Sequence, residues 1–394
     1  SFGGPAAQIA LMHKELVDNR KWLSEQEFLS GLSFCMSLPG PEAMQLATYS
    51  GWRMRGTLGG LLAGLLFVLP GAAVILALGA IYVSYGDIPL VQTLFLGVKA
   101  AVLAIVIEAL IKVAKRAFKS PLHWGLAVVS FVSIFVLALP FPAVIGVAAL
   151  IGYLTTPAAA HVPTPRVPFG QTLGTVSLWL ALWWLPILVL GFVIGQDFLF
   201  QLAVFFSKLA TVTFGGAYAV LAYMGQEVVQ GLGWISAAEM IDGLGLAETT
   251  PGPLILVTEF VGFLAGYNAG GAGLAVLAAI VTLWATFVPC FLWIFAGAPY
   301  IEWISAQPRL NGAMSAITAA VVGVIANLSI WFALNVIFSN VTRTPFGWMP
   351  ELASLDWRAL VLSCVAALLL LRLHIGLLKV LAISALLALG ASFI

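Results

Sequence analysis

The chain has 394 residues, of which 62% are hydrophobic and only 8% are charged. Average soluble domains contain about 45–50% apolar and about 25% charged residues, so 17 basic and 16 acidic side chains are too few to cover a soluble body of this length. The composition therefore excludes a soluble globule, a disordered chain, a basic nucleic-acid-binding surface and a disulfide-stapled scaffold. The net charge of +1 says nothing about a substrate.

Hydrophobic segments fill most of the chain. Because a transmembrane helix needs roughly 20 apolar residues, the sequence predicts an all-α polytopic membrane protein with about 13 hydrophobic segments. The uninterrupted segments are 57–83, 90–114, 121–139, 141–156, 172–194, 270–297, 311–338, 357–372 and 375–393. The segments 1–18, 24–50, 198–224 and 235–265 are interrupted by Gly and Pro.

The chain also contains an internal duplication. At an offset of 212 residues, Phe2-Gly3-Gly4 aligns with Phe214-Gly215-Gly216, and Pro39-Gly40-Pro41 aligns with Pro251-Gly252-Pro253. Positions 2–41 contain 16 identities at this offset, which a chance match of apolar sequence does not explain. We refer to these motifs as the FGG and PGP motifs. Because an apolar run precedes the second FGG motif, we expect a similar run before Ser1.

Farther along the chain the offset becomes 219 residues, so that Pro70 meets Pro289 and Ala100-Ala101-Val102 meets Ala319-Ala320-Val321. The duplication predicts four parts: an N-terminal repeat (1–156), a proline-rich linker (157–171), a connecting transmembrane helix (172–196) and a C-terminal repeat (197–394).

The relative orientation of the repeats depends on segment 24–50. If this segment crosses the membrane, an odd number of crossings separates the FGG motifs and the second repeat is inverted; if it is re-entrant, the repeats are parallel. We expect the crossing and the inverted repeat. The positive-inside rule then places Arg55 and Arg116 in the cytoplasm and Asn19 and Thr342 outside.

The FGG and PGP motifs interrupt apolar sequence at matching places in both repeats. Proline prevents a continuous helix, and the freed backbone groups are costly in hydrocarbon unless they face protein or a polar cavity. A single such motif is often only a packing kink, but paired interruptions point to a substrate site near the membrane midplane. A helix that starts after PGP directs its N–H groups and positive dipole end at the gap, an arrangement that suits an anion.

Charged side chains inside the apolar segments refine this prediction. Lys208 lies seven residues before Gly215, about two helical turns, and is expected on the same helix face. Lys99 is the other basic residue well inside an apolar segment. A buried lysine is costly and usually functional, although either one can instead snorkel to the interface. Glu42, Glu248 and Glu259 are either helix caps or proton-coupling groups. The candidate anion site is Gly3, Gly4, Gly40, Glu42, Gln45, Lys99, Lys208, Gly215, Gly216, Thr249, Thr250 and Gly252.

Several stretches resemble the chromate ion transporter family, and in particular its long, two-domain members. They are SFGGP (1–5), LPGPEAMQLATYSGWRMRGTLGGLLAG (38–64), FVLPG (67–71), FSKLATVTFGGAYAVL (206–221) and LAETTPGPLILVTEFVGF (246–263). The resemblance covers nearly the whole chain. It implies two oppositely oriented halves, chromate efflux, chromate resistance, and a functional role for the lysine ahead of the second FGG motif, which is Lys208 here.

Composition and spacing alone predict a duplicated transporter with a centre that suits an anion. With the resemblance added, we expect a secondary-active exporter of chromate in the bacterial cytoplasmic (inner) membrane. An exchanger or importer of sulfate remains the alternative, since sulfate has nearly the same shape and charge. A membrane enzyme or a structural subunit is not favoured, because no HExxH, GxSxG or histidine cluster is present and a subunit would not need paired breaks. We expect no metal, cofactor or nucleic-acid partner; the lipid bilayer is a partner, and a homodimer is compatible with the sequence.

Overall fold

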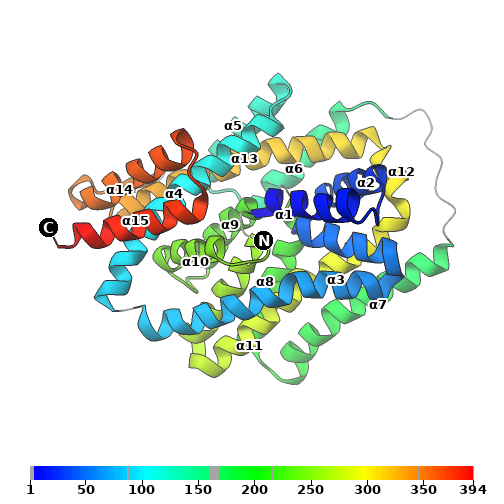
Figure 1. The fold of residues 1–394 in the computed structure, drawn as a ribbon, viewed down its shortest axis with the longest axis horizontal. Helices are drawn as coiled ribbons and strands as arrows, with labels where there is room; N and C mark the ends of the chain where they lie inside the picture. The colour runs from blue at the N-terminus through cyan, green and yellow to red at the C-terminus, as the bar shows by residue number, and fades with distance from the viewer. Residues whose placement is uncertain (1–3, 87, 159–167, 215, 345, 394) are drawn as a thin grey trace. The chain divides into compact units, whose positions relative to one another are not determined.

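The computed structural model describes residues 4–86, 88–158, 168–214, 216–344 and 346–393. Figure 1 shows that helices make up most of the described chain. Two short strands, β1 (Val341–Thr344) and β2 (Gly347–Pro350), pair antiparallel. The predicted all-α class is thus confirmed. The helices are α1 (Gly4–His13), α2 (Glu25–Met36), α3 (Glu42–Tyr85), α4 (Pro89–Ala117), α5 (Pro121–Phe135), α6 (Phe141–Thr155), α7 (Phe169–Leu188), α8 (Asp197–Val212), α9 (Ala217–Met224), α10 (Ala237–Thr249), α11 (Val257–Gly297), α12 (Ile301–Ser305), α13 (Pro308–Ile337), α14 (Trp357–Ala367) and α15 (Leu377–Ala391).

Several helices are extended by turns of other helical types. The π-helical turns are η1 (Lys14–Asn19), η2 (Val189–Val193), η3 (Gly225–Gly231) and η7 (Leu368–Arg372). The 3-10 turns are η4 (Leu254–Leu256), η5 (Ala298–Tyr300) and η6 (Leu352–Ser354).

The described helices fit a multi-pass membrane protein. Five of them are long and apolar enough to cross a bilayer: Glu42–Tyr85, Pro89–Ala117, Gly170–Val193, Leu254–Tyr300 and Pro308–Ile337. Shorter apolar helices are Pro121–Phe135, Phe141–Thr155 and Leu377–Ala391. A helix of 15 residues is only about 22 Å long, which is less than the hydrocarbon thickness of about 30 Å. The expected count of about 13 crossings is therefore not confirmed.

The chain forms two compact units, and each unit contains residues of both repeats. The first unit consists of Ser1–Ala77, Ile151–Ala217 and Thr250–Met314. The second consists of Leu78–Leu150, Tyr218–Thr249 and Ser315–Ile394. The units thus divide each repeat internally, so a compact unit is not the same thing as a sequence repeat.

The same series of local features occurs in both repeats. Ser24 and Glu27 form a capping box at the start of α2, and Ser236 and Glu239 form the same reciprocal pair of hydrogen bonds at the start of α10. Each capped helix is preceded by a π-helical turn, η1 or η3, and followed by a PGP motif whose glycine has a positive φ. The duplication is therefore visible in backbone geometry as well as in sequence.

The two longest helices, α3 and α11, are tight helical hairpins. Gly56 (φ 64°) divides α3, and Gly271 (φ 77°) divides α11. In α3, Gly51 and Gly59 lie so close that a β-carbon on either would collide with the other's carbonyl oxygen. Small residues therefore allow the two arms of the hairpin to pack with their backbones in contact. In α11 the equivalent contacts are made by Gly262 with Thr282 and by Gly266 with Ala278.

Segment 24–50 doubles back on itself, which corrects the expectation that it crosses the membrane. The Arg53 guanidinium donates to Glu27 Oε1 over 2.8 Å, and Gly31 packs against the Tyr49 ring. A straight helix would separate Glu27 from Arg53 by about 39 Å at 1.5 Å per residue. The PGP motif, at 39–41, is therefore the tip of a hairpin made by α2 and the first arm of α3. The parity argument for an inverted repeat assumed a crossing here and no longer holds.

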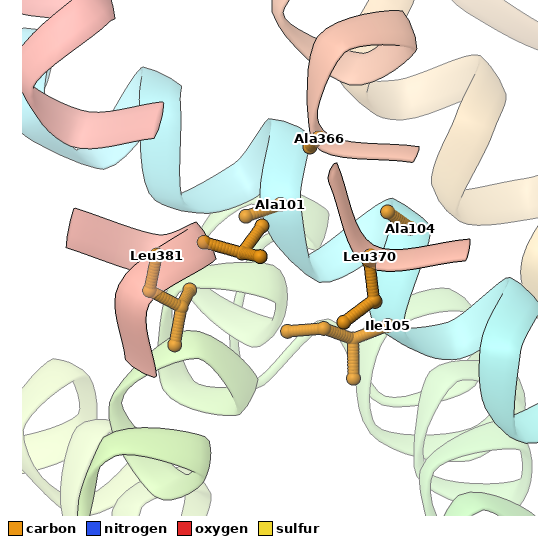
Figure 2. Packing of buried hydrophobic residues seen from close by; sticks show 7 residues of the cluster. Ala101, Ala104, Ile105, Ala366, Leu370 and Leu381 are labelled. Carbon is orange, nitrogen blue, oxygen red and sulfur yellow. The ribbon is translucent and has the colours of Figure 1, made fainter. Parts of the chain in front are cut away.

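In the second unit, α4 packs against α14, η7 and α15. Figure 2 shows Ala101 and Ala104 of α4 together with Ala366, Leu370 and Leu381, which belong to one cluster of buried hydrophobic residues. Gly97 sits against the Ser384 backbone with no room for a β-carbon. This close packing holds α4, the helix that carries Lys99, in a fixed register.

Candidate functional site

The PGP motif of the first repeat contacts the FGG region of the second. The Gly40 N–H donates to the carbonyl oxygen of Thr213 over 3.0 Å, and Thr213 is the extended residue at the end of α8. Gly40 has φ 112°, a conformation that favours glycine. A β-carbon at Gly40 would also press on the Gln45 amide and on Cys290 Sγ.

The PGP motif of the second repeat contacts the helix that follows the first FGG motif. Gln8 in α1 is 2% exposed, and its Nε2 donates to the Gly252 carbonyl oxygen over 2.6 Å. Gly252 has φ 119°, close to the value for Gly40. Gly71 lies directly against Pro251 and Gly252, and a β-carbon there would collide with the Pro251 carbonyl oxygen. The FGG and PGP regions of the two repeats are therefore brought together crosswise within the first unit.

A proline-containing helix arm supports each PGP motif. Cys290, which lies against Gly40, follows Pro289 of α11, and Gly71, which lies against Gly252, follows Pro70 of α3. Pro70 and Pro289 are the residues that the 219-residue offset aligns. Each repeat thus supplies the surface on which the other repeat's helix break rests.

Buried polar atoms without a protein partner gather on the elements that form these breaks. Gln45 is fully buried, and its Nε2 donates to the Pro39 carbonyl oxygen over 2.7 Å. Within the described residues no partner is found for Oε1 of Gln45, Oε1 of Gln8, Oε2 of Glu259 or the hydroxyls of Thr282 and Thr286. Native proteins leave few such atoms unpaired, and a group of them on adjoining elements is typical of a site that binds water or a polar ligand.

The helix starts at the breaks are as expected from the sequence. α3 begins at Glu42, directly after Pro41, so that its first N–H groups lie at the tip of the hairpin. α11 begins at Val257, after the 3-10 turn η4 that follows Pro253. Glu42 is half-buried in the first turn of α3. Thr249, at the end of α10, donates to the Leu246 carbonyl oxygen over 2.7 Å, and Thr250 is buried.

Lys208 is placed differently from the expectation. The preceding residue, Ser207, is buried and accepts a hydrogen bond from Trp183 Nε1 over 3.0 Å, so Lys208, about 100° farther around the helix, is turned to the exposed side. α8 ends at Val212, so the helical face that was to link Lys208 with Gly215 does not continue that far. Gly3 and Gly215 lie outside the described residues, whereas Gly4 begins α1 and Gly216 has φ 98°.

Lys99 and Glu248 lie in the second unit with partners that the sequence reading missed. Lys99 Nζ forms an ion pair with Asp242 over 3.3 Å, and Tyr218 Oη donates to Glu248 Oε1 over 2.7 Å. Neither Asp242 nor Tyr218 was predicted as a site residue, because an acid and a tyrosine in an apolar segment give no local signal of their partners. Gln8, Thr213 and Cys290 were missed for the same reason, since each becomes relevant only through a contact across the repeats.

Comparison with known proteins identifies relatives of the chain. A family model described as "Chromate transporter" matches residues 1–153 and 200–390. The chain is 33% identical over 327 residues to the "Probable chromate transport protein" of Synechococcus elongatus, covering 82% of this chain and 79% of that protein. It is 31% identical over 341 residues to the "Chromate transport protein" of Pseudomonas aeruginosa, covering 84% of this chain and 77% of that protein. With the "Chromate transport protein" of Cupriavidus metallidurans the identity is 31% over 343 residues, covering 84% and 79%. No solved structure gives a significant match.

Proposed function

The chain belongs to the chromate transporter family, and from this premise we propose that it carries chromate out of the cytoplasm by secondary-active transport and so confers chromate resistance. The relatives named above are called chromate transport proteins, or probable ones, and the stretches that carry the resemblance include both PGP motifs and both FGG motifs. The bacterial inner membrane is the proposed location.

The crosswise contact of the helix breaks is the observation that carries this proposal. Gly40 donates to Thr213, and Gln8 donates to Gly252, so the PGP motif of each repeat contacts a segment beside the FGG motif of the other repeat. The helix N-termini that follow the breaks supply N–H donors without requiring a fixed metal. A tetrahedral oxyanion needs donors around it and a positive potential, and Lys208 on α8 is the nearest basic residue in sequence to the Thr213 contact. We propose Gly40, Glu42, Gln45, Thr250, Gly252 and Lys208 as the residues that form or border the anion path.

Export of the bare dianion is energetically downhill in a cell that is negative inside. Moving one charge through the membrane is worth about 2.3 kcal/mol per 100 mV. A dianion therefore gains roughly 4–5 kcal/mol per 100 mV, which corresponds to more than about a thousandfold concentration ratio. The sequence contains no GxxxxGK[ST] loop for ATP. Glu42, Glu248 and Glu259 are the proposed candidates for coupling to a proton.

Sulfate transport is the second candidate, favoured by the shared shape and charge of the two oxyanions. The test is uptake by vesicles that contain the purified full-length chain. Radiolabelled chromate and sulfate are supplied separately at equal concentrations, and each is then used to compete with the other. We expect chromate uptake that excess unlabelled sulfate reduces only weakly. Efficient sulfate uptake with weak chromate competition would instead establish the sulfate transporter, and uptake of neither ion would reject both.

A further inference from the structure

The second unit contains an ion pair, between Lys99 and Asp242, that is not part of the anion path proposed above. Lys99 Nζ of α4 lies 3.3 Å from Asp242 Oδ2 of α10, and Tyr82 Oη at the end of α3 donates to the same oxygen over 2.9 Å. The Asp242 side chain is 6% exposed and that of Lys99 is 23% exposed. Within the described residues Asp242 Oδ1 has no hydrogen-bond partner. A carboxylate in these surroundings is held by one cation and one hydroxyl while half of it remains unsatisfied.

A glycine allows α10 and α4 to approach closely enough for this pair to form. A β-carbon at Gly245 would collide with the Val98 side chain of α4 and would crowd Val102. Asp242 and Glu248 each lie three residues from Gly245, one on either side, so at 100° per residue they flank the α10 face that packs on α4. The interface therefore has an apolar centre with one carboxyl group at each edge.

The second carboxyl group has its own set of neighbours. Glu248 Oε1 accepts a hydrogen bond from Tyr218 Oη of α9, and Glu108 and Lys112 of α4 act on it electrostatically. Glu108 and Lys112 form an ion pair of 2.8 Å with each other. Asp242 faces Lys99, Tyr82 and, along its own helix, Glu239. Asp242 forms an ion pair with Lys99, whereas Glu248 accepts a hydrogen bond from the Tyr218 hydroxyl. A change in the charge of Asp242 therefore acts directly on the Lys99 ammonium.

The positions of the other repeat that align with these charged residues carry uncharged residues. At the 212-residue offset, Asp242 aligns with Ser30 and Glu248 with Met36. At the 219-residue offset, Lys99 aligns with Thr318 and Glu108 with Asn327. The capping boxes and the PGP glycines occur in both repeats. In contrast, each of these four charged residues is present in only one of the two repeats. A feature carried by one copy of a duplicated fold is not part of the architecture that the two copies share.

We propose that Asp242 is a proton-binding residue of the transport cycle and that Lys99 is the cation it holds and releases. When the carboxylate takes up a proton from water, the Coulomb attraction that holds the ammonium is lost, while Tyr82 can still bond to the neutral acid. The ammonium of Lys99, which is partly exposed, is then available to an anion. Proton binding and anion binding are thereby linked, and the linkage is reciprocal. The proton-binding step concerns this chain alone, whereas its link to anion movement rests on the proposed function.

Infrared difference spectroscopy tests the proton-binding step without any substrate. The full-length chain in vesicles is titrated with acid, and the C=O stretch of protonated carboxylic acids is recorded for the wild type and for Asp242→Asn. We expect one component of the band to be absent in Asp242→Asn and to return at a shifted frequency in Asp242→Glu. Glu15→Gln, which removes the exposed carboxylate paired with Arg20, is the matched control and should leave the component assigned to Asp242 in place. Identical difference spectra for the wild type and Asp242→Asn would overturn the proposal.

Chromate-driven proton movement tests the link to transport. A pH-sensitive dye inside the vesicles reports protons moved per chromate for the wild type, for Asp242→Asn, and for the double variant Lys99→Gln with Asp242→Asn, which leaves no unpaired buried charge. We expect both variants to lose the chromate-driven proton signal. If chromate moves and the variants retain the wild-type proton signal, or if wild-type transport moves no protons, the link is wrong. If the wild type moves no chromate at all, the proposed function fails while the infrared result still decides the role of Asp242.

Discussion

At the scale of single residues, Lys208 is predicted from the sequence to take part in anion transport, and the structure places it at an exposed position on α8. Replacing Lys208 by Ala should abolish chromate transport with normal amounts of protein in the membrane, because the positive charge nearest in sequence to the Thr213 contact is lost. Lys208→Arg should also be impaired, since a planar guanidinium does not present its charge and donors as a compact ammonium does. Transport assays normalised to the membrane protein level provide the measurement.

The control for Lys208 is Lys115→Ala, which removes an exposed lysine from the last turn of α4. It should leave transport unchanged. If Lys208→Ala transports chromate as well as this control, Lys208 takes no part in the anion path, and the site must be assigned to the helix N-termini and amides alone.

The two PGP glycines give a second residue-level prediction. Gly40 and Gly252 have φ values of 112° and 119°, and in each case a β-carbon would also meet close neighbours. Gly40→Ala and Gly252→Ala should each cost about 1–3 kcal/mol of backbone strain, and they should reduce transport because the crosswise contacts shift. Gly125→Ala, within α5 where a β-carbon meets nothing, is the matched control and should be neutral or slightly stabilising. Thermal unfolding and uptake rates are measured together, and wild-type uptake by both PGP variants would contradict the site.

At the scale of elements, the hairpin formed by α2 and the first arm of α3 makes a topological prediction. Because Glu27 bonds to Arg53, the start of α2 and the end of that arm lie at the same depth. Asn19 closes η1 shortly before α2, where the Leu23 N–H donates to the Leu16 carbonyl oxygen, so Asn19 belongs to the same end of the hairpin. Single cysteines at Asn19 and Arg55 should therefore be labelled from the same side by a membrane-impermeant reagent.

Labelling of Asn19 and Arg55 from the same side of the membrane differs from the expectation drawn from the sequence, which placed these two residues on opposite sides. A cysteine-free background with each single cysteine in turn keeps the assay clean, because Cys35 and Cys290 are buried but Cys364 is exposed. Labelling of Asn19 and Arg55 from opposite sides would mean that segment 24–50 crosses the membrane after all.

At the scale of the whole molecule, the direction of transport depends on the membrane potential. In inverted vesicles, chromate uptake should fall when valinomycin and potassium collapse the potential, because the dianion then loses roughly 4–5 kcal/mol of driving force per 100 mV. The rate of uptake with the potential present and collapsed is the measurement. Uptake that survives this collapse but stops when only the pH gradient is removed would show obligatory proton exchange instead.

The sequence by itself determined that this is an α-helical membrane protein and where along the chain its helices break. Apolar segments of the right length predict membrane helices, and Gly and Pro at equivalent places in both repeats predict where those helices break, because these effects act within a few residues of the chain. The motifs around Gly40, Lys208 and Gly252 were also sufficient to place the chain in its family, which the comparisons then showed.

Only the tertiary structure decided where the chain goes after each break and which residues meet there. A PGP motif ends a helix but does not encode whether the next helix continues onward or turns back, because that choice depends on packing such as Gly31 against Tyr49. For the same reason the sequence did not pair Lys99 with Asp242 or Gly40 with Thr213, residues that lie far apart in the chain. Such pairs depend on how whole helices pack, and no local pattern of residues records that packing.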